Sequence, residues 1–189
     1  KSLEGEANGL AWSPDSRYVV WRSPMATGEA MIGQIRCWDE QGMGEPFELT
    51  RGAFDDSCPV FTADGKYLAM LSARTFDPNY DFDLSFGHTQ RPWLVPLSAT
   101  EASPFGPSSQ GWRISEVQDA KAKANAETSN GEADETVICH VAADGFEERM
   151  VPFPVPSGSY RDLAVVKDGV VWIEVADRGG ELGATRAGV

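Results

Sequence analysis

The two histidines are the first residues to consider for chemistry, because a hydrolytic triad needs an imidazole base beside a nucleophile and an orienting carboxylate. His88 lies in DLSFGHTQRP, close in sequence to Ser85 and Asp83. Neighbours along an extended segment point to opposite faces. The sequence also lacks the G-x-S-x-G pattern of a strained turn that exposes a nucleophilic serine. We therefore predict no catalytic residue in this chain and interpret His88 as a loop histidine.

Two other groups of residues could in principle hold a metal ion. Cys139 and His140 are adjacent, but no C-x-x-C or H-x-x-x-H pair accompanies them, and structural zinc needs four converging ligands. Alternation along TVICHVA predicts that one of the two is buried and the other exposed. Asp77, Asp81 and Asp83 offer oxygen ligands for calcium, but without EF-hand spacing and its glycine they are interpreted as a solvated turn. We predict neither a metal site nor a cofactor site, since no phosphate-binding glycine loop occurs either.

The composition narrows the classes of partner. The net charge is −13, which disfavours binding to nucleic-acid phosphates and to anionic membrane surfaces. No apolar run approaches the ~20 residues of a membrane helix. Three scattered cysteines (Cys37, Cys58 and Cys139) and no visible signal peptide favour a reducing, cytoplasmic location.

The elements that would position any site come from a short repeat. It reads LAWSPDSRYVVW at residues 10–21, PVFTADGKYLAM at 59–70 and, in shorter form, LAVVKDGVVWI at 163–173. Apolar runs flank a turn centred on Asp15, Asp64 or Asp168, which is the pattern of a β-hairpin. The first interval, 64 − 15 = 49, is close to one propeller blade. The second, 168 − 64 = 104, corresponds to two blades or to one blade with a long insertion.

Further strands follow each repeat. Residues 33–50 and 136–153 each read as strand, turn and strand, and residues 91–97 as one outer strand of a unit. Two hairpins make a four-stranded antiparallel blade, which must stack on other blades to cover both of its faces. We predict an all-β fold, a partial β-propeller of about three to four blades, with a β-sandwich as the alternative. The residues expected to be buried between blades are Trp12, Trp21, Phe61, Tyr67, Leu68 and Trp172.

One segment does not follow the repeat. Residues 99–135 begin as a Pro/Ser/Gly loop and continue as a charged, Ala-rich stretch without an apolar stripe. We predict that this segment is a flexible insertion within a blade. The abrupt first and last residues also lead us to expect a fragment of a longer chain.

Particular sequence segments resemble those of known protein families. SPDSRYVVW is similar to the repeat of TolB-like and WD40-like propellers. FTADGKYLAMLSARTFDPNYDFDLSF, RPWLVPLSATEASPF, DGFEERMVPFPVPSGSY and GELGATRAG more specifically resemble the second propeller of the tricorn protease family. The resemblance covers about residues 9–188, and the family pattern tends to be a few residues longer between Tyr80 and Phe82.

The tricorn resemblance implies a large cytoplasmic serine peptidase that trims oligopeptides. It implies a six-bladed and a seven-bladed propeller, the latter including residues 1–189, followed by a PDZ-like module and a catalytic C-terminal region. The propellers would gate or scaffold peptide passage, so the implied partners are peptides, other domains of the parent chain and further copies of it. The family's catalytic residues match no position here. The alternatives are a stand-alone TolB/WD40-like interaction propeller and an enzyme whose site lies on the propeller itself.

Overall fold

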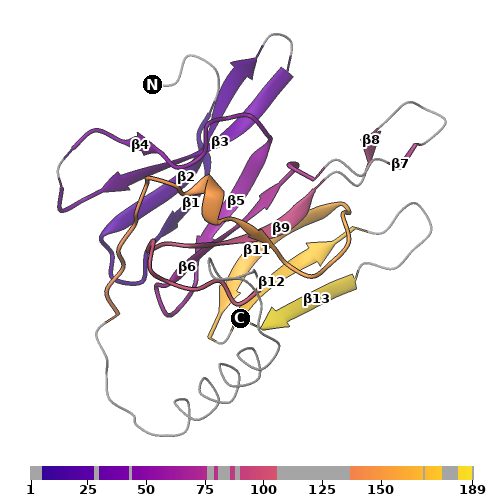
Figure 1. Ribbon diagram of the computed structural model, residues 1–189. Helices are drawn as coiled ribbons and strands as arrows, with labels where there is room; N and C mark the ends of the chain where they lie inside the picture. Colours follow the sequence, from indigo (N-terminus) through magenta and orange to yellow (C-terminus); the bar gives the residue numbers. More distant parts are fainter. Residues whose placement is uncertain are drawn as a thin grey trace, which may run out of the picture.

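Three antiparallel sheets lie side by side in chain order (Figure 1). The computed structural model describes residues 6–27, 30–42, 44–75, 79–80, 86–87, 90–105, 137–167, 169–175 and 183–188. Over these residues the regular secondary structure is strand apart from one short 3-10 helix, and the three sheets are successive blades of a partial propeller. None of the helical segments among them has the length and apolarity needed to cross a membrane.

The first blade is a four-stranded meander in which chain order and sheet order coincide. Its strands are β1 (Asn8–Trp12), β2 (Tyr18–Thr27), β3 (Ala30–Asp39) and β4 (Phe47–Glu48). The predicted strand, turn and strand over residues 33–50 correspond to β3 and β4 and are confirmed.

The second blade has the sheet order β5-β6-β9-β10. Its strands are β5 (Asp56–Phe61), β6 (Tyr67–Ser72), β9 (Arg91–Pro96) and β10 (Val151–Pro152). A two-stranded ribbon of β7 (Asn79–Tyr80) and β8 (Phe86–Gly87) lies between β6 and β9 in the sequence. The segment 91–97, predicted as an outer strand, is the third strand of this blade, because β10 pairs along its outer edge. The insertion after β9 therefore interrupts one blade, and the interval of 104 residues does not span two.

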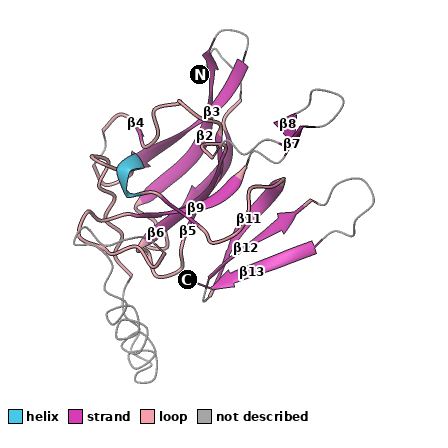
Figure 2. Ribbon diagram, turned by 45° about the vertical axis from the view of Figure 1, so that its right-hand side comes forward, coloured by secondary structure: helices cyan, strands magenta, loops and turns pink. Residues whose placement is uncertain are grey.

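The third blade consists of β11 (Tyr160–Val166), β12 (Gly169–Glu174) and β13 (Gly183–Gly188). Figure 2 shows these strands as a separate sheet beside β5, β6 and β9. The hairpin β11–β12 closes where Val166 pairs with Gly169, so the third repeat also forms a hairpin. Asp168, in its turn, lies outside the described residues.

The first two turns have the same hydrogen bonds, which explains why the repeat could be read from the sequence. In the first, the Ser13 hydroxyl donates to the Asp15 carboxylate and accepts the Tyr18 N–H at 2.8 Å. In the second, Thr62 donates to Asp64 and accepts the N–H of the equivalent tyrosine at 3.0 Å. A hydroxyl and a carboxylate at this spacing satisfy the backbone of a tight turn without help from the rest of the fold.

Strand β6 is buried on both faces and joins the two cores. Its odd-numbered residues, Tyr67, Ala69 and Leu71, pack toward the third blade, whereas Leu68 and Met70 pack toward the first. We call the two packed regions the first interface and the second interface. The first interface includes Tyr18, Val20, Ile35, Cys37 and Leu49 from blade one against Phe61, Leu68, Met70, Val95, Cys139 and Phe146. The second interface includes Tyr67, Leu71, Leu94 and Phe153 against Tyr160, Leu163, Val170 and Trp172.

The predicted core is largely confirmed, with two exceptions. Phe61, Tyr67, Leu68 and Trp172 are buried, but Trp21 is half-buried and Trp12 is 51% exposed. Trp12 is paired with Val19 across β1 and β2, and Phe61 is paired with Leu68 at the equivalent position of β5 and β6 in the next blade. The position is therefore the expected one, but over the described residues no sheet packs on that face of the first blade.

The predicted hairpin over 136–153 is wrong in its first half. Residues 137–143 form no strand, because their backbone donors find partners in other elements. The Cys139 N–H donates to the Asp15 carboxylate at 2.7 Å, and the Ala142 N–H donates to the Leu97 carbonyl at 2.8 Å. The chain then turns through the short 3-10 helix η1 (Glu147–Arg149) into β10.

The chain on either side of the insertion contacts equivalent tyrosines of the repeat. The Tyr67 hydroxyl donates to the Ala102 carbonyl at 3.0 Å, and Val141 packs with Tyr18 in the first interface. Residues 99–105 and 137–143 thus lie on opposite sides of the second blade. Residues 106–135 of the predicted insertion lie outside the described residues, so their flexibility stays a prediction.

Candidate functional site

The described residues test only part of the sequence-based site predictions. The residues considered for a triad or a calcium site, His88, Ser85, Asp83, Asp81 and Asp77, lie outside them. The expected lack of catalytic, cofactor and metal sites therefore stays a prediction. Within the described part of the chain, no three His, Cys, Asp or Glu side chains are grouped closely enough to hold a metal ion.

Of Cys139 and His140, one was predicted to be buried and the other exposed, and this is confirmed. Cys139 is fully buried in the first interface, whereas His140 is exposed. Burial, reinforced by the nearby carboxylate of Asp15, raises the pKa of the Cys139 thiol to about 11. The thiol is thus protonated near neutral pH and is a core side chain, because only the thiolate is a good ligand or nucleophile.

An ion-pair cluster at the first interface was not predicted from the sequence. We call Asp56, Ser72, Arg74 and Glu147 the Arg74 junction. One terminal nitrogen of Arg74 lies 3.0 and 3.2 Å from the two carboxylate oxygens of Asp56, and its Nε donates to the Ser72 hydroxyl at 2.9 Å. The same terminal nitrogen lies 3.4 Å from Glu147. Arg74 and Glu147 are 73 residues apart in the sequence, and no local pattern signals their contact.

Asp56 is the most unusual group of the junction, because its side chain is completely buried. Burial raises the pKa of its carboxyl, and the Arg74 guanidinium with the Ser72 and Thr50 hydroxyls acts in the opposite direction. Thr50 follows β4, so a hydroxyl of the first blade acts on the pKa of a carboxyl of the second.

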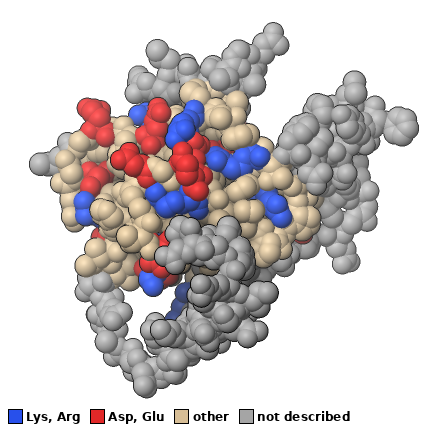
Figure 3. Space-filling model, in the orientation of Figure 1, with Lys and Arg blue, Asp and Glu red and all other residues tan. Residues whose placement is uncertain are grey.

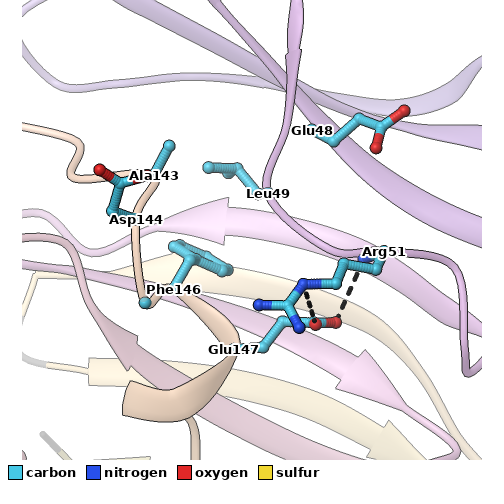
Figure 4. Close-up of a pocket in the computed structure, with 8 residues that line it drawn as sticks. Glu48, Leu49, Arg51, Ala143, Asp144, Phe146 and Glu147 are labelled. Atoms are coloured by element: carbon cyan, nitrogen blue, oxygen red, sulfur yellow. Dashed lines mark hydrogen bonds and ion pairs between the residues drawn. The ribbon is translucent and has the colours of Figure 1, made fainter.

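A hollow of about 280 Å³ lies beside this junction, between the end of β4 and the turn before η1 (Figure 4). Its lining residues are Glu48, Leu49, Arg51, Ala143, Asp144, Gly145, Phe146 and Glu147. Arg51 closes one side, with its backbone N–H 3.2 Å and its Nε 3.5 Å from the Glu147 carboxylate. Figure 3 shows acidic and basic side chains next to one another on this face of the molecule.

The chemistry available in the hollow is limited. Its lining contains no serine, threonine, cysteine or histidine, so a nucleophile with an imidazole base cannot be assembled from these residues. Its arginine and one of its glutamates are already paired with each other. The arrangement joins the outer part of the first blade to the second blade, which is a structural role.

The inner strands form a second surface of interest. β1, β5 and β11 are each the terminal strand of their sheet, and β5 contacts both β1 and β11. Over the part of the chain that the structure describes, the inner edges of these three strands pair with no further strand, and they lie next to one another, where the axis of a propeller would run. Cys58 on β5 is partly exposed, and its side chain also packs against the second interface.

We predict that one thiol per folded chain reacts with a maleimide at neutral pH. Cys58 is partly exposed, whereas Cys37 and Cys139 are completely buried. Burial, with a smaller effect of Asp39, raises the pKa of Cys37 to about 12, so both core thiols lack access and thiolate character. Mass spectrometry after labelling with and without denaturant measures the stoichiometry. Labelling of Cys37 or Cys139 at the rate of Cys58 would contradict the described packing.

Comparison with protein families shows similarity over nearly the whole chain. The model of the tricorn protease second beta propeller domain matches residues 1–187. Tricorn protease homolog 1 of Streptomyces coelicolor is 40% identical over 190 residues, which cover 99% of this chain and 17% of that protein. The tricorn protease of Thermoplasma volcanium is 28% identical over 185 residues, covering 95% of this chain and 16% of that protein.

A solved structure supports the same fold. The crystal structure of the tricorn protease superimposes with a TM-score of 0.65 at 24% identity, covering 95% of this chain and 16% of that one. The chain thus spans about one sixth of the length of the proteins that it matches.

Proposed function

Because this chain belongs to the tricorn protease second β-propeller domain family, we propose that it is a non-catalytic propeller segment of a longer, cytoplasmic, tricorn-type serine peptidase. In this proposal the segment gates or scaffolds the passage of peptides to and from an active site in a separate C-terminal region. The observation that carries the proposal is the juxtaposition of the three inner strand edges, which gives the blades a common axial surface.

The proposed partners are peptides, other domains of the parent chain and further copies of that chain. The open face of the first blade supports association, since Leu10 and Trp12 are 64% and 51% exposed. Trp12 is equivalent to Phe61 of the second blade, and a neighbouring blade covers Phe61. Large exposed apolar side chains at a repeated interface position are typical of surfaces that are covered in an assembly.

We expect the purified chain to hydrolyse neither short fluorogenic peptides nor esters, because no nucleophile and base pair is predicted in it. Release of the fluorophore, followed after repurification, measures this. Turnover that persists in the purified chain and disappears on Ser85→Ala or His88→Ala substitution would overturn the non-catalytic assignment.

A second experiment addresses passage through the propeller in the full-length enzyme. We expect a bulky maleimide polymer on Cys58 to slow the processing of long peptides and to leave the turnover of a short fluorogenic substrate unchanged. The Cys58→Ser enzyme treated with the same reagent controls for labelling at other cysteines. Equal rates for long peptides in labelled Cys58 and Cys58→Ser enzymes would contradict a port along this axis.

A further inference from the structure

Each of the three inner strands contains a one-residue bulge at the same place. In β5, the pairs Ser57–Leu71 and Val60–Ala69 enclose two residues on β5 but one on β6. β1 and β11 show the same shift, between Asn8 and Ala11 and between Arg161 and Ala164. A bulge leaves one residue unpaired and bends the strand.

The first bulged residue is left-handed in every copy. The φ angles are 62° at Gly9, 51° at Cys58 and 55° at Asp162. Each of these residues stands six positions before the turn aspartate of its repeat, since 9 + 6 = 15, 58 + 6 = 64 and 162 + 6 = 168. Only the first copy has the glycine that this conformation favours. Two copies maintain the bulge with residues that adopt it at a cost, so the bulge is a constant feature of this repeat.

The bulges lie on edges that face the proposed axis. Each one is in the terminal strand of its sheet, and a Cβ placed on Gly9 would lie 3.4 Å from the Cδ of Pro59, the second bulged residue of β5. The bulges of β1 and β5 are thus side by side. Pro59 in addition has no N–H to offer to another strand.

We propose that these bulges prevent an extended chain from adding to the inner edges as a further β-strand. A free, regular edge presents a continuous row of N–H and C=O groups and is a template for strand addition. A bulge at the same position in β1, β5 and β11 interrupts that row on each of these three edges. This inference does not require peptide passage. If peptides do pass along the axis, they meet a surface that does not hold them by backbone pairing.

The simplest competing explanation is that the bulges only keep the strands packed. In β11 the bulge allows both Tyr160 and Leu163 to face the second interface, although three positions separate them. The two explanations differ in what removal of a bulge does to an external strand. Under the packing explanation the chain becomes less stable, whereas under ours it also acquires a site for an extended peptide.

The test uses the third blade, because the bulged Asp162 is exposed there. The probe is a fluorescein-labelled peptide with the sequence of β12, GVVWIE, which is the natural antiparallel partner of β11. Fluorescence anisotropy compares the parent chain, deletion of Asp162 and the matched control Asp162→Gly. The control removes the same charge but retains the bulge. A second peptide, GVPWIE, controls for apolar binding without strand pairing.

We expect the deletion variant to bind GVVWIE roughly tenfold more tightly than the parent and the Asp162→Gly chain, and to bind GVPWIE no better than they do. A deletion variant that unfolds cooperatively but binds GVVWIE no better than Asp162→Gly would overturn the proposal. Where the deletion prevents folding, Asp162→Val replaces it, because a β-branched residue opposes the left-handed conformation. Equal binding by Asp162→Val and Asp162→Gly would then overturn it.

Discussion

Replacement of Trp172 by alanine is expected to lower the free energy of unfolding by about 3–5 kcal/mol, the usual cost of truncating a large, well-packed aromatic side chain. The Trp172 side chain is 1% exposed and lies at the centre of the second interface. Its ring is 5.4 Å from that of Phe153 in the second blade and 6.3 Å from that of Tyr160 in the third. Truncation would leave a cavity that rigid sheets on both sides cannot close.

The matched control for this prediction is Trp12→Ala. Trp12 is the same residue type in the first blade but is half exposed, so we expect a loss of about 0.5 kcal/mol, as for other surface substitutions. Urea unfolding followed by circular dichroism measures both, since tryptophan fluorescence changes when a tryptophan is removed. Similar losses for the two variants would show that the third blade does not depend on packing against the second.

The hairpins could be predicted from the sequence because the information that specifies them is local. Asp15 and Asp64 each cap a turn with a hydroxyl two residues earlier, so the turn is complete within a few residues. Burial of Trp12 could not be predicted in the same way. The position repeats, but whether it is covered depends on a neighbouring sheet and not on the hairpin itself.

Long-range polar contacts could not be predicted from the sequence at all. Residues 137–143 alternate like a strand, but they lie along Asp15 and Leu97, which are far away in the sequence. The Arg74 junction similarly joins β5, the end of β6 and η1, and each of its charges alone reads as an ordinary surface residue. The bulges are an intermediate case. They stand at a constant distance from the turn aspartate, but Gly9, Cys58 and Asp162 share no side-chain chemistry that marks them in the sequence.

The Arg74 junction leads to the second large prediction. We expect Arg74→Met to lower the free energy of unfolding by about 3–5 kcal/mol at neutral pH, because it leaves a buried carboxylate without its cation. Asp56 is completely buried and Arg74 is 10% exposed, so solvent cannot replace the lost partner. Arg51→Met is the matched control. Its ion pairs with Glu147 and Glu148 are at the surface, with Arg51 72% exposed, and such pairs contribute little.

The pH dependence of the loss identifies Asp56 as its source. Burial already raises the pKa of Asp56 above its ordinary value of 3.8, and removal of Arg74 takes away the main influence that lowers it. A carboxyl whose pKa is higher in the folded state than in the unfolded state contributes to stability. This contribution is fully present at a pH below the unfolded-state pKa, and it is lost as the pH rises through the folded-state pKa. The difference between the parent and Arg74→Met should therefore be small in acid and grow as the pH rises through the folded-state pKa of Asp56 in the parent, which lies above the ordinary value of 3.8. In the double variant Asp56→Asn/Arg74→Met this growth should disappear and part of the stability should return, since no buried charge remains. A loss that is equal at all pH values, or a double variant no more stable than Arg74→Met, would mean that Arg74 acts through its packing on Phe54 and Trp93 instead.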